Sequence, residues 1–118
     1  MTRKKYLVDN YGIKHHIKEK AKVVYHQKLV IPGGLLSERI IWKIPQSRQY
    51  PYGFKYRLIL VNPLTREVVL LYDNHWPKGP HIHRNKEERV YEFVTPDKLL
   101  KDFIEEEKYY YENKKNIN

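Results

Sequence analysis

The sequence predicts an α+β domain, in which an antiparallel sheet of about five strands in meander order is covered by a C-terminal helix. Length and composition favour one domain over residues 1–118, since 41% of the residues are hydrophobic. Short segments rich in β-branched residues follow one another closely, which favours antiparallel pairing over βαβ units. After Thr95 the apolar residues recur every three or four positions instead of every two.

The chain begins with a basic lead-in, residues 1–16, in which no regular pattern predicts an element. The first predicted strand spans residues 21–31, is rich in β-branched side chains, and ends at a Pro-Gly-Gly breaker. A second strand over residues 37–44 follows at hairpin distance and stops at a proline. These two segments therefore form the start of the meander.

The clearest strand pattern spans residues 52–61, where apolar side chains occupy every second position. The residues that share this apolar face are Phe54, Tyr56, Leu58 and Leu60, whereas Lys55 and Arg57 point to the other face. Residues 68–73 form a short, almost continuous apolar run, as expected of a central strand. The last predicted strand covers residues 89–94.

The final segment has the features of a helix. Thr95 is a good N-cap, Pro96 suits the first helical position, and Asp97 suits the positive end of the helix dipole. One apolar stripe follows, made of Leu99, Leu100, Phe103 and Ile104. This stripe is expected to pack on one face of the sheet, with residues 113–118 as a frayed tail.

The charge balance points to a polyanionic partner. The chain has 23 Lys and Arg against 14 Asp and Glu, and residues 1–94 contain 18 basic but only 8 acidic side chains. Such an excess favours nucleic acid, with the solvated surface of a thermophilic protein as the alternative. Cysteine is absent, which excludes disulfides and thiolate ligands. No secretion signal and no long apolar run is evident, so we expect a cytoplasmic protein without a membrane partner.

Three of the six histidines lie within the segment "DNHWPKGPHIHR", residues 73–84. If the chain is extended after Pro80, His81 and His83 project from the same side and Ile82 faces the core. His75 precedes a short Pro- and Gly-containing loop that can fold it back towards this pair. We expect Lys78 and Arg84 to surround the histidines with positive charge.

Three interpretations of this cluster compete. In the first, His81 and His83 share the acid and base roles in cleaving an RNA phosphodiester, with a cation stabilising the phosphoryl oxygens. In the second, neutral imidazoles bind zinc or another divalent ion, with Asp73 or a glutamate completing the site. In the third, they are polar loop residues, with Trp76 capping the core. Residues 74–86 contain no acid, which favours the first interpretation and predicts no metal and no cofactor.

A nucleic-acid-binding surface is predicted on the neighbouring strands. The candidates for phosphate contacts are Arg39, Lys43, Lys55 and Arg57, and Tyr56 is a candidate for stacking on a base. The alternative for the cations is the solvated face of the sheet, and for the tyrosine it is the core.

The run "YGFKYRLILVNPLTREVVLLYDNHWPKGPHIH", followed by "YEF" and "LLKDFIEE", resembles the TumE family of type II toxins. The resemblance covers roughly residues 36–106. It implies a small toxin that acts on RNA and is neutralised by a helix-turn-helix antitoxin. The site positions that carry over are Asp73, Asn74, His81 and His83. Pro80 stands where a His-His-x-His run would have its first histidine, and His75 can supply that imidazole from the other end of the loop.

Together these observations predict a toxin-like endoribonuclease that needs no metal. The second hypothesis is a non-catalytic module that binds nucleic acid or the antitoxin, with the histidines only positioning the loop. The third is a metal-dependent hydrolase. The sequence leaves the oligomeric state open, and a homodimer is among the options.

Overall fold

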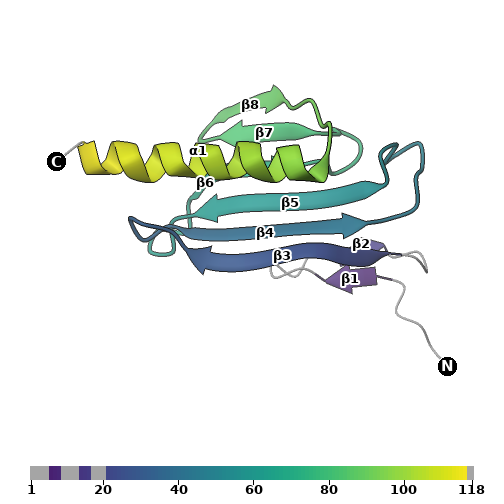
Figure 1. Cartoon of the computed structure of the whole chain (residues 1–118), viewed down its shortest axis with the longest axis horizontal. Helices are drawn as coiled ribbons and strands as arrows, with labels where there is room; N and C mark the ends of the chain where they lie inside the picture. Colours follow the sequence, from purple (N-terminus) through teal and green to yellow (C-terminus); the bar gives the residue numbers. More distant parts are fainter. Residues whose placement is uncertain (1–5, 9–13, 17–20, 117–118) are drawn as a thin grey trace.

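The computed structural model describes residues 6–8, 14–16 and 21–116, and it consists of a curved sheet with one long helix across one face (Figure 1). The main sheet is antiparallel throughout and has six strands in sequence order. The strands are β3 (Lys22–Val30), β4 (Leu36–Lys43), β5 (Phe54–Val61), β6 (Val68–Asp73), β7 (His81–Arg84) and β8 (Glu87–Val90). Helix α1 (Pro96–Asn116) follows the last strand. The predicted α+β class and meander order are confirmed.

Two short strands lie within the basic lead-in. These are β1 (Tyr6–Val8) and β2 (Lys14–His16), which pair with each other as a separate two-stranded antiparallel sheet. The other residues of the lead-in lie outside the described part of the chain.

The main sheet has one strand more than predicted, because the histidine segment is itself a strand. β7 pairs with β6 on one side and with β8 on the other. A two-residue turn joins β7 to β8, and its first residue, Asn85, has a φ of 54°. Asparagine tolerates this left-handed conformation better than most residues, so the turn is a favourable hairpin connection.

The last predicted strand, residues 89–94, is wrong at its C-terminal end because β8 already stops at Val90. The residues that follow leave the sheet so that two aromatic side chains can pack against the core. Phe93 stacks on Tyr56 with ring centroids 5.7 Å apart. The hydroxyl of Tyr91 donates a hydrogen bond to Asp102 of α1, at 2.7 Å.

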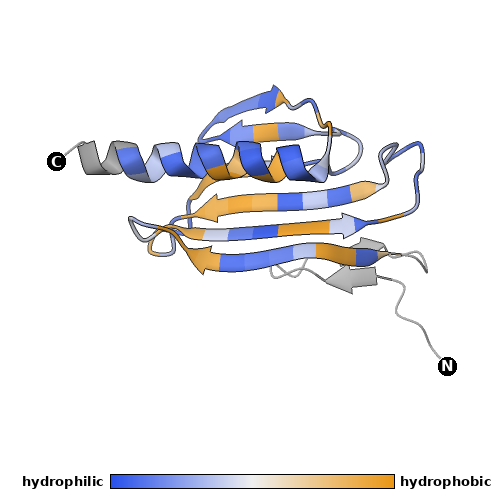
Figure 2. Cartoon of the chain, viewed as in Figure 1, coloured by the Kyte–Doolittle hydropathy of each residue, from blue (hydrophilic) through white to orange (hydrophobic). Residues whose placement is uncertain are grey.

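The alternation of side chains divides the sheet into two faces. On the face under α1, the cross-strand register aligns Leu58 with Tyr72 and Tyr72 with Ile82. These residues are buried, as are Leu99 and Phe103 of the helix. Figure 2 shows the corresponding pattern, with apolar bands alternating with polar ones along the strands and the helix. We call the opposite side of the sheet, which α1 does not cover, the open face, although Trp42 and Ile59 are buried on it.

The helix begins as predicted. Thr95 Oγ1 accepts a hydrogen bond from the Lys98 backbone N–H at 3.1 Å, so the N-cap is formed. Of the predicted stripe, Ile104 is an exception because it is 41% exposed. The next position of the buried stripe after Phe103 is Glu107, an acid. α1 continues to Asn116, beyond the point where the tail was expected to fray.

Candidate functional site

The open face brings together the residues of the histidine segment with cations of β5. Arg57 is aligned with Asp73, and Asp73 with His81, so these three side chains form one row across β5, β6 and β7. His83 follows two residues along β7 on the same face, as the period of a strand requires. Ile82 between the two histidines is buried in the core, which confirms the predicted orientation of this segment.

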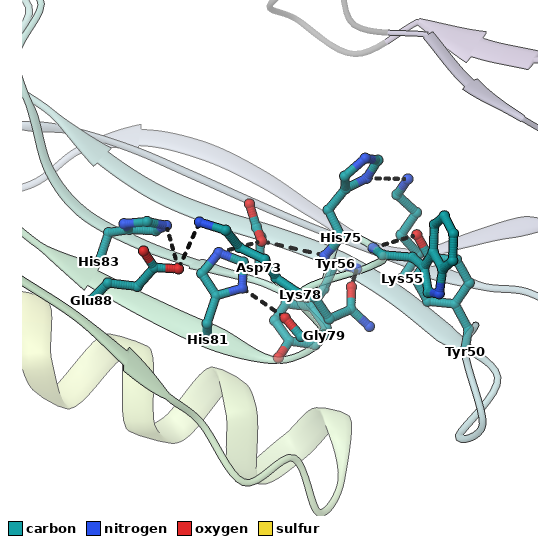
Figure 3. A network of polar contacts seen from close by, with 12 residues as sticks. Tyr50, Lys55, Tyr56, Asp73, His75, Lys78, Gly79, His81, His83 and Glu88 are labelled. Carbon is teal, nitrogen blue, oxygen red and sulfur yellow. Dashed lines mark hydrogen bonds and ion pairs between the residues drawn. The ribbon is translucent and has the colours of Figure 1, made fainter. Parts of the chain in front are cut away.

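Both ring nitrogens of His81 are in contact with hydrogen-bond acceptors (Figure 3). Its Nδ1 lies 2.7 Å from the carbonyl oxygen of Gly79, and its Nε2 lies 3.1 Å from Asp73 Oδ1. Neither a carbonyl nor a carboxylate can donate a hydrogen. The contact with Gly79 is a hydrogen bond, whereas the contact with Asp73 is an ion pair only when the ring is protonated. The side chain of His81 is 8% exposed, so these two contacts define its surroundings.

His83 is the more accessible imidazole. Its ring meets that of His81 edge to face, with centroids 4.8 Å apart, and its side chain is 32% exposed. Its Nε2 lies 3.8 Å from Oε1 of Glu88, the residue aligned with it on β8. Glu88 also accepts a hydrogen bond from Lys78 Nζ at 2.9 Å. The lysine holds the pKa of the Glu88 carboxyl below its ordinary value, with smaller contributions from the two histidines.

The loop between β6 and β7 is held in place by Asn74 and shaped by Gly79. Asn74 accepts a hydrogen bond from the Tyr56 backbone N–H at 3.0 Å and donates one to the Phe54 carbonyl at 2.8 Å. Its amide thereby continues the backbone pairing of β5 past the end of β6. Gly79 has a φ of 73°, which only glycine adopts readily, and this turn presents its carbonyl to His81.

His75 lies two residues after Asp73, at the start of the β6–β7 loop, next to Lys55. Its Nδ1 is 3.3 Å from Lys55 Nζ, and since an ammonium group has only donors, Nδ1 must accept. The His75 backbone N–H donates to Asp73 Oδ1 at 3.3 Å, and the same oxygen contacts His81. Asp73 therefore connects the two histidines that the loop separates.

Two residues predicted near the cluster are placed elsewhere. Arg84 lies on the helix face, where its Nη2 donates to Glu106 at 2.7 Å, because it is one residue out of phase with His83. Trp76 is 51% exposed and does not cap the core. Its backbone N–H donates to the Tyr50 hydroxyl at 3.3 Å.

The predicted nucleic-acid contacts divide between the two faces. Lys55 and Arg57 lie on the open face with the histidines, whereas Arg39 and Lys43 align with Leu58 and Phe54 on the helix face. Arg39 is buried and donates from Nε to Glu107 of α1 at 3.1 Å. Tyr56 is 1% exposed in the core, so its ring does not meet a base.

Glu88 is the site residue that the sequence interpretation missed. It stands two positions beyond residues 74–86, the segment that contains no acid. Asn85, which tolerates a turn conformation, was the available signal for a two-residue hairpin, and this hairpin places Glu88 opposite His83. With Glu88 and Asp73 present, the histidines have acidic neighbours on both sides, which removes the main sequence argument against a metal. One ligand atom each from His81, His83 and Glu88 lie within 4.8 Å of one another.

A family model described as toxin TumE matches residues 2–110. The chain belongs to the TumE toxin family. No curated protein matches the chain. No solved structure matches it either.

As a member of the TumE family, the chain is the toxin component of a toxin–antitoxin system. Its partner, at the level of the family, is an antitoxin. The suspected TumE resemblance is thereby confirmed, and the matched region is larger than the motifs that suggested it. In the part of the chain that the structure describes, no helix is both long enough and apolar enough to span a bilayer.

Proposed function

We propose that this TumE-family toxin cleaves RNA at the open face by histidine acid–base chemistry that needs no metal. The observation that carries the proposal is the pair His81 and His83, which lie side by side on an open face that also carries Lys55 and Arg57. Imidazoles exchange protons near neutral pH, and cations favour a phosphodiester.

In the proposed reaction, His83 accepts the proton of a ribose 2′-hydroxyl, and the resulting oxygen attacks the adjacent phosphorus. The bond from phosphorus to the 5′-oxygen breaks, which leaves a 2′,3′-cyclic phosphate. His81 gives its Nε2 proton to the departing 5′-oxygen. Its position supports this role because Nδ1 is held by the Gly79 carbonyl and Nε2 lies 3.1 Å from Asp73 Oδ1. Arg57 stabilises the charge that develops on the phosphoryl oxygens.

The setting of this reaction is part of the proposal. RNA is the substrate, the cytoplasm is the compartment, and the antitoxin is a helix-turn-helix protein. Because the helix face is already covered by α1, we infer that the antitoxin neutralises the toxin by covering the open face.

The experiment is cleavage of total RNA by the purified chain, with and without EDTA. We expect His83→Ala to lower the cleavage rate by about 100-fold or more, the usual contribution of one acid–base group. EDTA should leave the rate of the unchanged protein intact. The matched control is His26→Ala, since His26 is also on the open face but lies two strands from Arg57 and pairs with Glu38, at 3.1 Å. Undiminished cleavage by His83→Ala would overturn the assignment.

A second candidate function is supported by the same contacts of His81. Its side chain is 8% exposed and both its nitrogens already have partners, which also suits a residue that only fixes the loop. The toxin would then bind RNA or the antitoxin without cutting. RNA binding that weakens with salt and never produces fragments, in any variant or buffer, favours this function.

A further inference from the structure

The contact between His81 and Asp73 places two acceptors against each other unless a cation separates them. Nδ1 of His81 faces the Gly79 carbonyl at 2.7 Å, so this nitrogen carries a hydrogen. In the neutral ring, Nε2 then presents a lone pair to the Asp73 carboxylate, 3.1 Å away. A proton on Nε2 resolves this conflict, and so does a metal ion bound to Nε2.

The surroundings of Nε2 match those of a metal-binding histidine. A ligating histidine usually donates its other N–H to a backbone carbonyl or a carboxylate, which fixes the ring and leaves one lone pair for the metal. The Gly79 carbonyl has that position here. The ligand atoms of His81, His83 and Glu88 lie within 4.8 Å of one another, and the 3.1 Å between His81 and Asp73 is close to the ligand spacing of about 3.3 Å around a tetrahedral zinc ion.

We propose that His81, His83 and Glu88 bind one divalent ion of the zinc class, with Asp73 beside His81 as a neighbouring carboxylate. Two imidazoles and one carboxylate, with a fourth position for water, are a donor set that such ions accept in the absence of thiolates. β6, β7 and β8 supply these residues from adjacent, paired strands, so the ligands are held on a rigid part of the fold.

Lys78 is the group that the ion displaces. Its ammonium lies 2.9 Å from Glu88 Oε1 but its side chain is 59% exposed, so it can turn into solvent when the carboxylate binds a metal. His83 Nε2 and Glu88 Oε1 are 3.8 Å apart and close up slightly around the ion. Both side chains are partly exposed and have room for this adjustment.

Metal binding has a consequence for the reaction, and this part of the inference rests on the proposed function. An imidazole nitrogen that is bound to a metal neither accepts nor donates a proton. Occupancy of the site therefore stops acid–base cleavage, and the ion acts as an inhibitor of the toxin.

Binding is tested with Zn²⁺ and Co²⁺ alone on the full chain. We expect one Zn²⁺ per chain in a chelator competition, and visible absorption from bound Co²⁺ that Zn²⁺ removes. Glu88→Gln and His83→Ala should each weaken binding by more than about 100-fold, the upper end of what the loss of an outer partner causes. Glu88 is exposed, so Glu88→Gln keeps the fold if His83→Ala does not. The control His26→Ala should bind like the unchanged chain. No bound ion, or equal binding by Glu88→Gln, would overturn the site.

Inhibition is tested by adding one equivalent of Zn²⁺ to the RNA cleavage assay and then removing it with EDTA. The expected result is a loss of about 100-fold that EDTA reverses, since both imidazoles are withdrawn together. A cleavage rate that rises with Zn²⁺ would overturn the inhibitory role. Stoichiometric metal binding by a chain that never cleaves RNA would instead overturn the proposed function and leave the metal site standing.

Discussion

At the scale of single residues, Glu107 places a charge on the buried face of α1. Its partner is Arg39 of β4. Arg39 and Glu107 are 6% and 1% exposed, and Arg39 donates from both Nε and Nη2 to the same carboxylate oxygen. An ion pair in such surroundings offsets the desolvation of both groups only while both are present. The two residues therefore depend on each other for the docking of the helix.

We expect Glu107→Ala to lower the free energy of unfolding by about 3 kcal/mol, because Arg39 is left as a buried charge without its partner. Urea denaturation followed by circular dichroism measures this. The double variant Arg39→Met, Glu107→Leu should lie much closer to the unchanged protein, since it removes both charges and refills the volume. A double variant no more stable than Glu107→Ala would show that the charges themselves matter little.

The sequence predicted single residues well where the strand period alone decides their direction. His81, Ile82 and His83 are the example, since alternation is sufficient to place two imidazoles on one face. It failed for Arg39, which was predicted to contact phosphate or solvent, and it made no prediction for its partner Glu107. The spacing of Leu99, Phe103 and Glu107 by fours was the available signal, but a charged side chain at a buried helix position needs a partner that only the tertiary structure identifies.

At the scale of elements, the connection between β8 and α1 is fixed by Asp102. Its carboxylate accepts hydrogen bonds from Tyr91 and from Lys98 Nζ, both at 2.7 Å. Burial raises the pKa of Asp102, but these two hydrogen bonds outweigh burial and hold the pKa below its ordinary value. The ionised carboxylate thus ties the start of the helix to the segment that leads into it.

Because folding lowers the pKa of the Asp102 carboxyl, the ionised carboxylate stabilises the folded protein. This stabilisation is fully present above the pKa that Asp102 has in the unfolded chain, and it is lost as the pH falls through its pKa in the folded protein. The loss is expected below about pH 4, the ordinary range of an aspartate. Asp102→Asn should lower the free energy of unfolding by about 1 kcal/mol at neutral pH, and by almost nothing in strong acid. Denaturation curves of both proteins across this range test it, and a pH-independent difference would contradict it.

The element predictions were accurate where breakers and caps mark the ends, as at Thr95 and at the Pro-Gly-Gly turn after β3. The β7–β8 hairpin was not predicted because each of its strands has only four residues. Such strands carry too short a pattern to be distinguished from a loop. The aromatic residues after Val90 resembled a strand, yet packing of Phe93 on Tyr56 and of Tyr91 on Tyr72 took precedence over strand pairing.

At the scale of the whole molecule, acids and bases are distributed unequally between the two faces. The acids of α1 pair with Arg39 and Arg84 on the covered face. Lys55, Arg57 and Lys78 lie by contrast around the histidines. The cations around the histidines are thus not matched by the acids of α1, a division that net charge alone cannot reveal.

RNA binding by the open face should weaken steeply as the salt concentration rises, because phosphate contacts release counterions. Lys55→Ala should reduce the slope of log K against log salt by about 0.7, the value for one contact with single-stranded nucleic acid. Fluorescence anisotropy with a labelled RNA measures both slopes. Lys108→Ala on the outer side of α1 is the control and should leave the slope unchanged, since its side chain is 60% exposed and pairs with Glu112. Equal slopes for all three proteins would place the RNA elsewhere.

Because successive side chains of β7 point to opposite faces of the sheet, the direction of each one depends on the length of the β6–β7 loop. If one residue were inserted after Asn74 and β7 slipped by one position to compensate, His81 and His83 would turn towards α1. Ile82 and Arg84 would turn towards solvent, so one insertion would exchange the chemistry of the two faces. Substitutions within this loop therefore affect the protein one contact at a time, whereas a change in its length acts on the core and on the histidines at once. The β6–β7 loop should therefore accept substitutions far more readily than insertions or deletions.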